Sequence, residues 1–171
     1  MDTHKRGWLT GLLAGVAALG TTLGASSARA ASVAGANGSA GTNANTSAND
    51  EARHKLVYQV NHAEPEHLEH ILNSVGAVLG QYGDDVSVAI VAFAAGLHLL
   101  GTRPERPIPE ALRQRVRSMA THYGVQLYAC GNTMKSLGWG PERIVPEAKI
   151  EEVGAATLMA LQERGYAYIA W

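Results

Sequence analysis

The only cysteine of the chain, Cys130, stands where an apolar run gives way to a helical pattern. Residues 125–129, VQLYA, alternate in the way that is typical of a strand, and residues 133–137 suit a short helix. The thiol therefore lies at the carboxyl end of a strand, where free N–H groups and the helix dipole favour an anion and lower its pKa. Cys130 is a candidate nucleophile. The alternative is a structural role, because free cysteines are often buried.

Two histidines are candidate bases for this thiol. His98 follows the second expected strand, whereas His122 ends a later helix. His98 is preferred, since the loop after a neighbouring strand borders the same crevice. His67 and His70 lie one turn apart on an expected helix, but the glutamates beside them are typical of a solvated face. We predict no metal site.

Other catalytic signatures are missing from the sequence. It has no CxxC pair, no glycine-rich phosphate loop and no serine-centred hydrolase turn. A single cysteine cannot form the internal disulfide of a dithiol oxidoreductase, and no cofactor is predicted. The 14 Lys and Arg residues nearly balance the 15 Asp and Glu residues, which disfavours nucleic acid as a partner.

The first 30 residues have the pattern of a signal peptide. Basic residues 4–6 precede the weakly apolar stretch Gly7–Leu23, and Ala28-Arg-Ala30 is a typical cleavage motif. Cleavage after Ala30 predicts a periplasmic or secreted protein without stable membrane insertion. The alternative is an uncleaved anchor. The Lys5-Arg6 pair resembles an incomplete twin-arginine signal, so the general and twin-arginine export routes both stay open.

The next segment, residues 31–53, is an expected flexible linker. Most of it consists of Ala, Gly, Ser, Asn and Thr, which cannot bury enough apolar surface to offset the entropy of ordering. The remainder, residues 54–171, has the length of one compact domain.

Strand and helix patterns alternate within residues 54–171. The expected strands are 55–60, 85–93, 125–129, 149–153 and 166–171, and the expected helices are 64–79, 108–123, 133–137 and 155–164. This alternation predicts an α/β fold: a single three-layer domain with a five-stranded, mostly parallel sheet and helices on both faces. The continuous apolar run at 85–93 suits a central strand.

The expected helix at 108–123 has one apolar stripe, formed by Ile108, Leu112, Val116, Met119 and Tyr123. Three arginines, at positions 113, 115 and 117, lie on its other sides. They would meet either an anion or water, and a solvated face is the preferred interpretation.

Polar and glycine residues follow three of the strands. In parallel sheets, ligands bind beyond the carboxyl ends of strands. The ends here are Asn61-His62, Phe93–Gly96 and Cys130–Thr133. We therefore predict one pocket around Cys130, with the binding candidates Asn61, Gly96, His98, Gly131, Asn132 and Thr133.

Several motifs together resemble the DsrE/DsrF-like family over essentially the whole domain after His54. They are Val60-Asn61, Ala95-Gly96-Leu97 before Leu99-Leu100, Cys130-Gly-Asn-Thr133 and Gly165-Tyr-Ala-Tyr-Ile169, of which YACGNTMKSLG is the most specific. The resemblance implies a small α/β protein with a flavodoxin-like strand order that assembles into trimers or hexamers. Some members carry sulfur as a persulfide on a cysteine, which corresponds here to Cys130.

Two functional hypotheses follow from the residues and the resemblance. In the first, Cys130 is the persulfide site of an exported sulfur-transfer or sulfur-carrier protein. The relay members of the family act in the cytoplasm, so the sulfur donor and acceptor of an exported chain are unidentified. In the second, the domain is a non-catalytic small-ligand-binding or assembly module, and its cysteine is structural.

The last expected strand ends in aromatic residues, Tyr166, Tyr168 and Trp171. Apolar patches of this kind often mark interfaces, and we expect a homo-oligomer. The alternative is that these side chains fold back on their own sheet.

Overall fold

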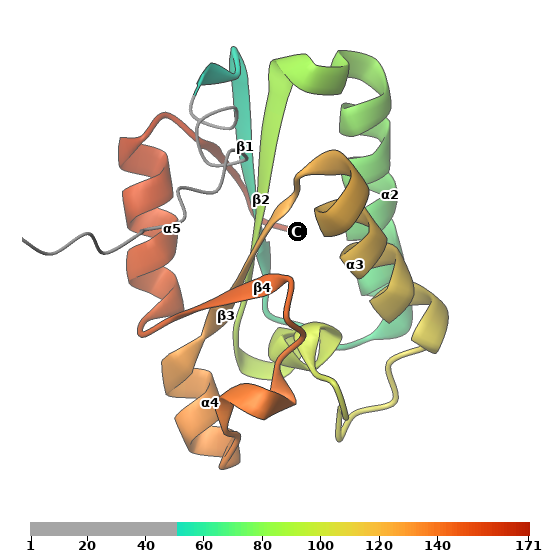
Figure 1. The fold of residues 1–171 in the computed structure, drawn as a ribbon, viewed down its shortest axis with the longest axis vertical. Helices are drawn as coiled ribbons and strands as arrows, with labels where there is room; N and C mark the ends of the chain where they lie inside the picture. Colours follow the sequence, from blue (N-terminus) through green and yellow to red (C-terminus); the bar gives the residue numbers. More distant parts are fainter. Residues whose placement is uncertain (1–50) are drawn as a thin grey trace, which may run out of the picture. The chain divides into compact units, whose positions relative to one another are not determined.

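A computed structural model describes residues 51–171 (Figure 1). The expected signal peptide and residues 31–50 of the expected linker lie outside this part of the chain. The strands are β1 (His54–Val60), β2 (Val86–Ala92), β3 (Gln126–Cys130), β4 (Ala148–Glu151) and β5 (Ala167–Ile169). The α-helices are α2 (Pro65–Tyr82), α3 (Glu110–Tyr123), α4 (Gly131–Leu137) and α5 (Gly154–Glu163). Short 3₁₀ helices are η1 (Gly83–Asp85), η2 (Ala94–Leu100) and η3 (Pro141–Arg143).

The five strands form one parallel sheet in the order β4-β3-β2-β1-β5. The predicted α/β class is therefore confirmed. The strand order differs from the flavodoxin-like order 2-1-3-4-5, because β1 lies between β2 and β5. The first three crossovers all step the same way along the sheet, and only the connection through α5 returns. The direction in which successive strands are added therefore reverses beside β1. The end of β3, which carries Cys130, lies two strands away from this point.

Helices cover both faces of the sheet, as expected. Right-handed crossovers that step in one direction leave their helices on one face, so α2 and α3 share a face, and α5, on the returning connection, covers the other (Figure 1). Among residues 51–171, none of the helices has the length and apolarity needed to span a bilayer.

The larger core cluster lies between the sheet and helices α2 and α3. The buried residues of α2 recur at helical spacing and are Leu68, Ile71, Leu72, Val75 and Leu79. In α3 the stripe is right at Leu112, Val116 and Met119 but wrong at Tyr123, which is 65% exposed. Tyr123 is the last residue of α3, where Gly124 turns the chain out of the helix with φ +67°.

The smaller core cluster lies on the α5 side of the sheet and contains a polar network. Tyr166 is buried there, and its hydroxyl lies 2.7 Å from both Ser87 Oγ and Gln126 Nε2. The Tyr128 hydroxyl donates to the side-chain oxygen Oε1 of Gln126 at 2.8 Å. These bonds satisfy polar groups that β2 and β3 bury. Of the three terminal aromatics, Tyr166 therefore folds back on the sheet, while Tyr168 and Trp171 remain 39% and 50% exposed.

Candidate functional site

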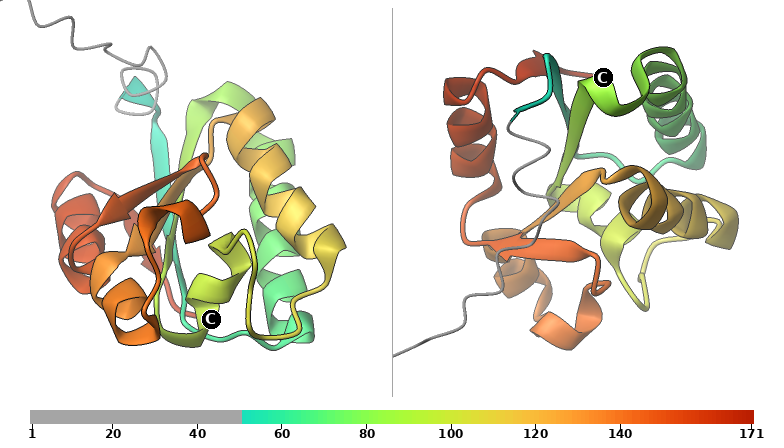
Figure 2. Two further views of the ribbon diagram at one scale, coloured as in Figure 1. Left: turned by 60° about the horizontal axis from the view of Figure 1, so that its bottom comes forward. Right: turned by 45° about the horizontal axis from the view of Figure 1, so that its top comes forward.

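Cys130 is the last residue of β3 and directly precedes α4, as the sequence predicted. The helix begins earlier than expected, at Gly131, so Gly131 and Asn132 belong to it. At the carboxyl end of the sheet α4 lies beside η2 (Figure 2). The Cys130 side chain is enclosed by these elements, and the residue is only 6% exposed.

The first turn of α5 contacts the thiol. The N–H of Gly154 donates to Cys130 Sγ over 3.3 Å. A Cβ at position 154 would lie 3.1 Å from Cys130 Cβ, 3.4 Å from Sγ and 3.3 Å from the Phe93 ring. Contacts of 3.1–3.3 Å are too close for carbon atoms, whose optimal separation is about 3.5–4.0 Å. The absence of a side chain at Gly154 therefore allows its N–H to reach the sulfur.

Thr133 connects the thiol to η2. Its Oγ1 accepts the N–H of Ala94 at 3.1 Å, and its hydroxyl is also hydrogen-bonded to the thiol of Cys130. Ala94 has φ +48°, in the left-handed region, which costs a non-glycine residue about 1–2 kcal/mol. The hydrogen bond to Thr133 helps to hold this strained residue in place. Thr133 is thus the predicted site residue that acts on Cys130 through its side chain.

Two opposing effects set the pKa of Cys130. Burial alone raises it, since the thiolate is poorly solvated. Hydrogen bonds from the backbone of Thr133 and Gly154, the hydroxyl of Thr133 and the backbone of Asn132 outweigh this effect, so that the pKa is lowered from 9.0. Specific donors therefore favour the thiolate in a largely buried position.

Gly131 and Asn132 also hold the loop between β4 and α5 against the start of α4. The N–H of Asn132 donates to the carbonyl oxygen of Glu152 at 3.0 Å. A Cβ on Gly131 would lie 3.2 Å from the Glu151 carbonyl oxygen. Both predicted residues therefore border the site, with a positioning role through their backbone.

Gly96 and Asn61 meet at the same end of the sheet, but through backbone packing. A Cβ on Gly96 would lie 2.2 Å from the carbonyl oxygen of Val60 and 2.8 Å from the Asn61 nitrogen. Only a glycine lets η2 come this close to the end of β1. In the described part of the chain, no hydrogen bond joins either residue to Cys130.

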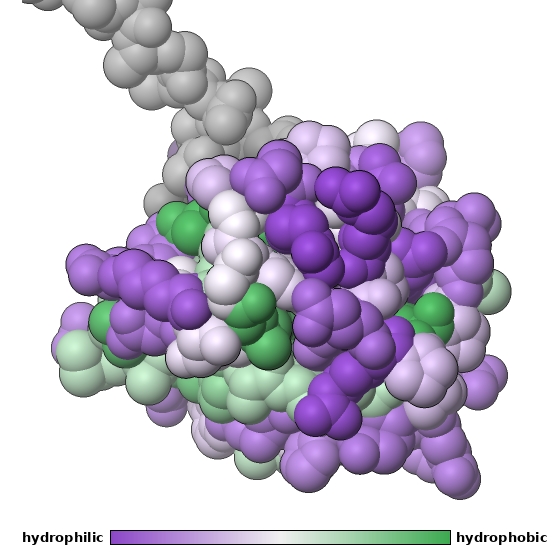
Figure 3. Space-filling model, turned by 90° about the horizontal axis from the view of Figure 1, so that it is seen from below, coloured by the Kyte–Doolittle hydropathy of each residue, from purple (hydrophilic) through white to green (hydrophobic). Residues whose placement is uncertain are grey.

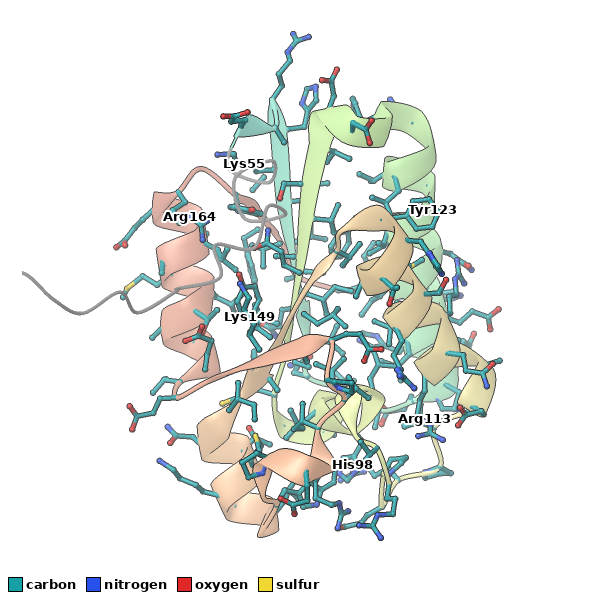
Figure 4. All side chains as sticks on the ribbon, in the orientation of Figure 1. Lys55, His98, Arg113, Tyr123, Lys149 and Arg164 are labelled. Atoms are coloured by element: carbon teal, nitrogen blue, oxygen red, sulfur yellow. The ribbon has the colours of Figure 1, made fainter. Side chains whose placement is uncertain are left out.

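His98 faces other partners than the thiol. It is 3% exposed, its Nδ1 accepts the N–H of Glu105 at 3.1 Å, and its ring packs edge-on against Trp139. Burial, followed by the charge of Arg106, lowers the pKa of His98. The hydrogen bonds described for Sγ come from other residues, so the predicted role of His98 as a base for Cys130 has no contact to support it. Figure 4 places His98 near the lower end of the molecule.

The other histidines of the sequence analysis lie elsewhere. His122 is in the last turn of α3, before β3 begins, and therefore at the opposite end of that strand from Cys130. The His62 and His67 rings lie 5.1 Å apart, and burial lowers the pKa of His67. Within residues 51–171 no three His, Cys, Asp or Glu side chains converge in a way that suits a metal ion.

A pocket of about 280 Å³ opens beside this site. Its lining residues are Ala94, Ala95, His98, Arg106, Thr133, Ser136 and Leu137. His98 and Thr133, both predicted, thus share one cavity, and Thr133 also interacts with Cys130. The sequence alone does not single out Arg106, Ser136 or Gly154, since no local pattern distinguishes them from ordinary surface or turn residues.

The chain belongs to the DsrE/DsrF-like family, whose model matches residues 34–171. Curated proteins give no significant match.

Two solved structures resemble the described domain. One is a protein of unknown function, MTH1491 from Methanobacterium thermoautotrophicum, with 18% identity and a TM-score of 0.60 over 69% of this chain and 99% of that one. The other is the ychN protein of E. coli, with 17% identity and a TM-score of 0.53 over 69% of this chain and 99% of that one. At these identities the likeness shows the shared fold.

Proposed function

We propose that this protein is a sulfur carrier that holds sulfane sulfur as a persulfide on Cys130. The observation that carries the proposal is the environment of the thiol: N–H groups and the Thr133 hydroxyl lower its pKa although the residue is 6% exposed. A structural cysteine needs no such donors, whereas a nucleophilic thiolate does. Membership of the DsrE/DsrF-like family is consistent with this role.

The chemistry is a transfer between sulfur atoms. The Cys130 thiolate attacks the terminal sulfur of a donor persulfide, the donor's S–S bond breaks, and its electron pair leaves with the donor thiolate. The donors around Cys130 Sγ also stabilise the negative charge of the new persulfide, whose outer sulfur is bonded to Sγ. Because the chain has one cysteine, the persulfide cannot collapse into an internal disulfide. An acceptor thiolate must therefore attack it and remove the sulfur.

The carrier acts outside the cytoplasm, in the periplasm or as a secreted protein. Support comes from the basic, apolar and small-residue pattern of residues 1–30. Amino-terminal sequencing of the exported protein tests this assignment, and the expected first residue is Ala31. Recovery of uncleaved chain from the membrane fraction would contradict it.

The carrier also works as a homo-oligomer, as a trimer or hexamer by family resemblance. Support comes from large apolar side chains that remain exposed on β4, α5, β5 and the segments beside them, namely Ile150, Val153, Met159, Tyr168 and Trp171. Sedimentation analysis at micromolar concentration is the test. A strictly monomeric mass would contradict the assembly.

The second candidate function is a binding or assembly module with a structural cysteine. The near-complete burial of Cys130 favours it, because a buried thiol resists bulky reagents. Uptake of sulfur separates the two functions.

The decisive experiment is incubation of the folded protein with thiosulfate, polysulfide or a small persulfide, followed by intact-mass analysis. The carrier gains one sulfur atom, which a reducing thiol removes. Cys130→Ser is the matched control and gains none. If the wild-type protein gains no sulfur from any donor and resists alkylation, the carrier function is wrong and the binding module replaces it.

A further inference from the structure

The pocket beside Thr133 has the composition of an anion site. It lies at the carboxyl end of the sheet, where hydrophilic side chains surround smaller apolar areas (Figure 3). Its charged lining residue is Arg106, from the loop that joins η2 to α3. Its polar lining residues are His98, Thr133 and Ser136.

Arg106 is a cation without a partner among residues 51–171. In the described part of the chain its guanidinium has no hydrogen-bond or ion-pair partner. The neighbouring Arg143 differs, since it donates to Glu105 at 3.0 Å and stacks on Trp139 at 4.6 Å. A guanidinium offers five N–H donors in a planar fork that suits oxyanions. Arg106 therefore has its full donor set available to a ligand of the pocket.

His98 adds a second donor. Since its Nδ1 accepts the N–H of Glu105 at 3.1 Å, a neutral His98 ring carries its proton on Nε2. Burial and the nearby Arg106 lower the pKa of His98 and favour this neutral form. The ring therefore has one N–H left for the pocket that it lines. Thr133 and Ser136 contribute oxygens, but the Ser136 hydroxyl already donates to the Asn132 carbonyl at 3.0 Å.

We propose that this pocket binds the sulfonate end of a small thiosulfonate-class sulfur donor, such as thiosulfate, through Arg106 and the Nε2–H of His98. The assignment rests on the proposed carrier function and names its substrate class. Thr133 lines the pocket and also contacts Cys130, so an anion in the pocket lies one residue away from the thiol. A cavity of about 280 Å³ and a thiol that is 6% exposed suit a small inorganic donor better than a protein-bound persulfide.

The transfer then balances without an external oxidant or reductant. The Cys130 thiolate attacks the outer, sulfane sulfur of thiosulfate. The S–S bond of thiosulfate breaks, and its electron pair leaves with sulfite, which Arg106 stabilises by its charge. The products are the Cys130 persulfide anion and sulfite, and the total charge is unchanged.

Direct binding tests the pocket without the chemistry. Thiosulfate is titrated into Cys130→Ser and into the same protein carrying Arg106→Gln, with calorimetry or amide chemical shifts as the readout. Loss of the guanidinium should weaken binding roughly fivefold or more, since charge-assisted hydrogen bonds are about twice as strong as neutral ones. Arg103→Gln is the matched control, because Arg103 lies on the same loop outside the pocket lining, and it should bind like its parent.

The rate of sulfur uptake tests the assignment in the reactive protein. Arg106→Gln should take sulfur from thiosulfate at least roughly fivefold more slowly than the wild type, while neutral iodoacetamide alkylates both at the same rate. If Cys130→Ser binds no thiosulfate, or if Arg106→Gln and the wild type take up sulfur equally fast, the pocket assignment is overturned and the carrier function stands. If no donor loads Cys130, the carrier function fails, and the substrate assignment fails with it whatever the pocket binds.

Discussion

The N–H of Gly154 points at the sulfur of Cys130 over 3.3 Å, although the two residues are 24 positions apart in the chain. The contact joins the end of β3 to the start of α5. The thiol therefore receives hydrogen bonds from two segments. One is the start of α4, which follows Cys130 directly, and the other is the start of α5. Changes at the start of α5 should alter the reactivity of a cysteine that lies on another element.

Gly154→Ala tests this contact. The new methyl carbon would lie 3.1 Å from Cys130 Cβ and 3.3 Å from the Phe93 ring, so α5 must shift away. We expect a loss of about 1–3 kcal/mol in the free energy of unfolding, as for other overpacked sites, and slower alkylation of Cys130. Urea unfolding and the alkylation rate measure the two effects.

Gly80→Ala is the matched control for this substitution. Gly80 lies within α2, and a Cβ there meets nothing within 4 Å. Alanine should stabilise that helix by about 0.5–1 kcal/mol and leave the thiol unchanged. If Gly154→Ala and Gly80→Ala have the same free energy of unfolding and the same rate of Cys130 alkylation, crowding at Gly154 does not affect the thiol.

Thr133→Val removes the hydroxyl that is hydrogen-bonded to Cys130 while keeping the shape of the side chain. The pKa of Cys130 should rise, because one donor to the thiolate is lost and burial, which raises the pKa, remains. Alkylation at neutral pH should slow by roughly tenfold, which equals about 1.4 kcal/mol. Thr133→Ser keeps the hydroxyl and should retain most of the reactivity. A pH–rate profile for each variant decides the outcome, and identical profiles for all three proteins would refute the role of Thr133.

Gly96→Ala tests whether Gly96 is needed for backbone packing or for ligand binding. With a Cβ only 2.2 Å from the Val60 carbonyl oxygen, η2 and β1 cannot keep their approach. We expect destabilisation by about 3 kcal/mol or more, or failure to fold, as for severe backbone clashes. Thermal unfolding is the readout. A variant with wild-type stability and impaired sulfur uptake would instead support a binding role.

The position of Cys130 was predictable because it depends on local sequence. The alternation of residues 125–129 ends there, and the helical segment follows directly. The alternating strand and helix patterns likewise predicted the α/β class. The buried stripe of α2 was predictable for the same reason, since its five apolar residues recur with the helical period.

Features that depend on long-range packing could not be predicted from the sequence. The strand order requires knowing that β5 pairs with β1, and the role of Gly154 requires the return of α5 over the end of β3. His98 lines the pocket beside Thr133, yet its ring is held by Glu105 and Trp139, and no local pattern identifies these partners. Gly96 was expected to bind a ligand because it follows the carboxyl end of a strand, whereas in the structure it allows a close backbone approach to Val60. Both roles select glycine.

Stability should fall between neutral and mildly acidic pH because of His98. Burial lowers its pKa below 6.5, and Arg106 and Arg143 act in the same direction, against Glu105. Between the lowered pKa of the folded state and about 6.5, the unfolded chain binds a proton that the folded chain does not. The free energy of unfolding is therefore greatest above about pH 6.5 and is lost as the pH falls through the folded pKa. His67, whose pKa burial also lowers, adds a loss of the same sign.

The variant His98→Asn isolates this contribution. The Asn side-chain oxygen can replace Nδ1 as acceptor for the N–H of Glu105, but it does not titrate in this range. Urea unfolding at pH 7 and pH 5 should give a smaller difference in unfolding free energy for His98→Asn than for the wild type. His122→Asn, at the exposed end of α3, is the control and should keep the wild-type difference. If His98→Asn loses as much stability on acidification as the wild type, protonation of the buried His98 ring is not what destabilises the folded state.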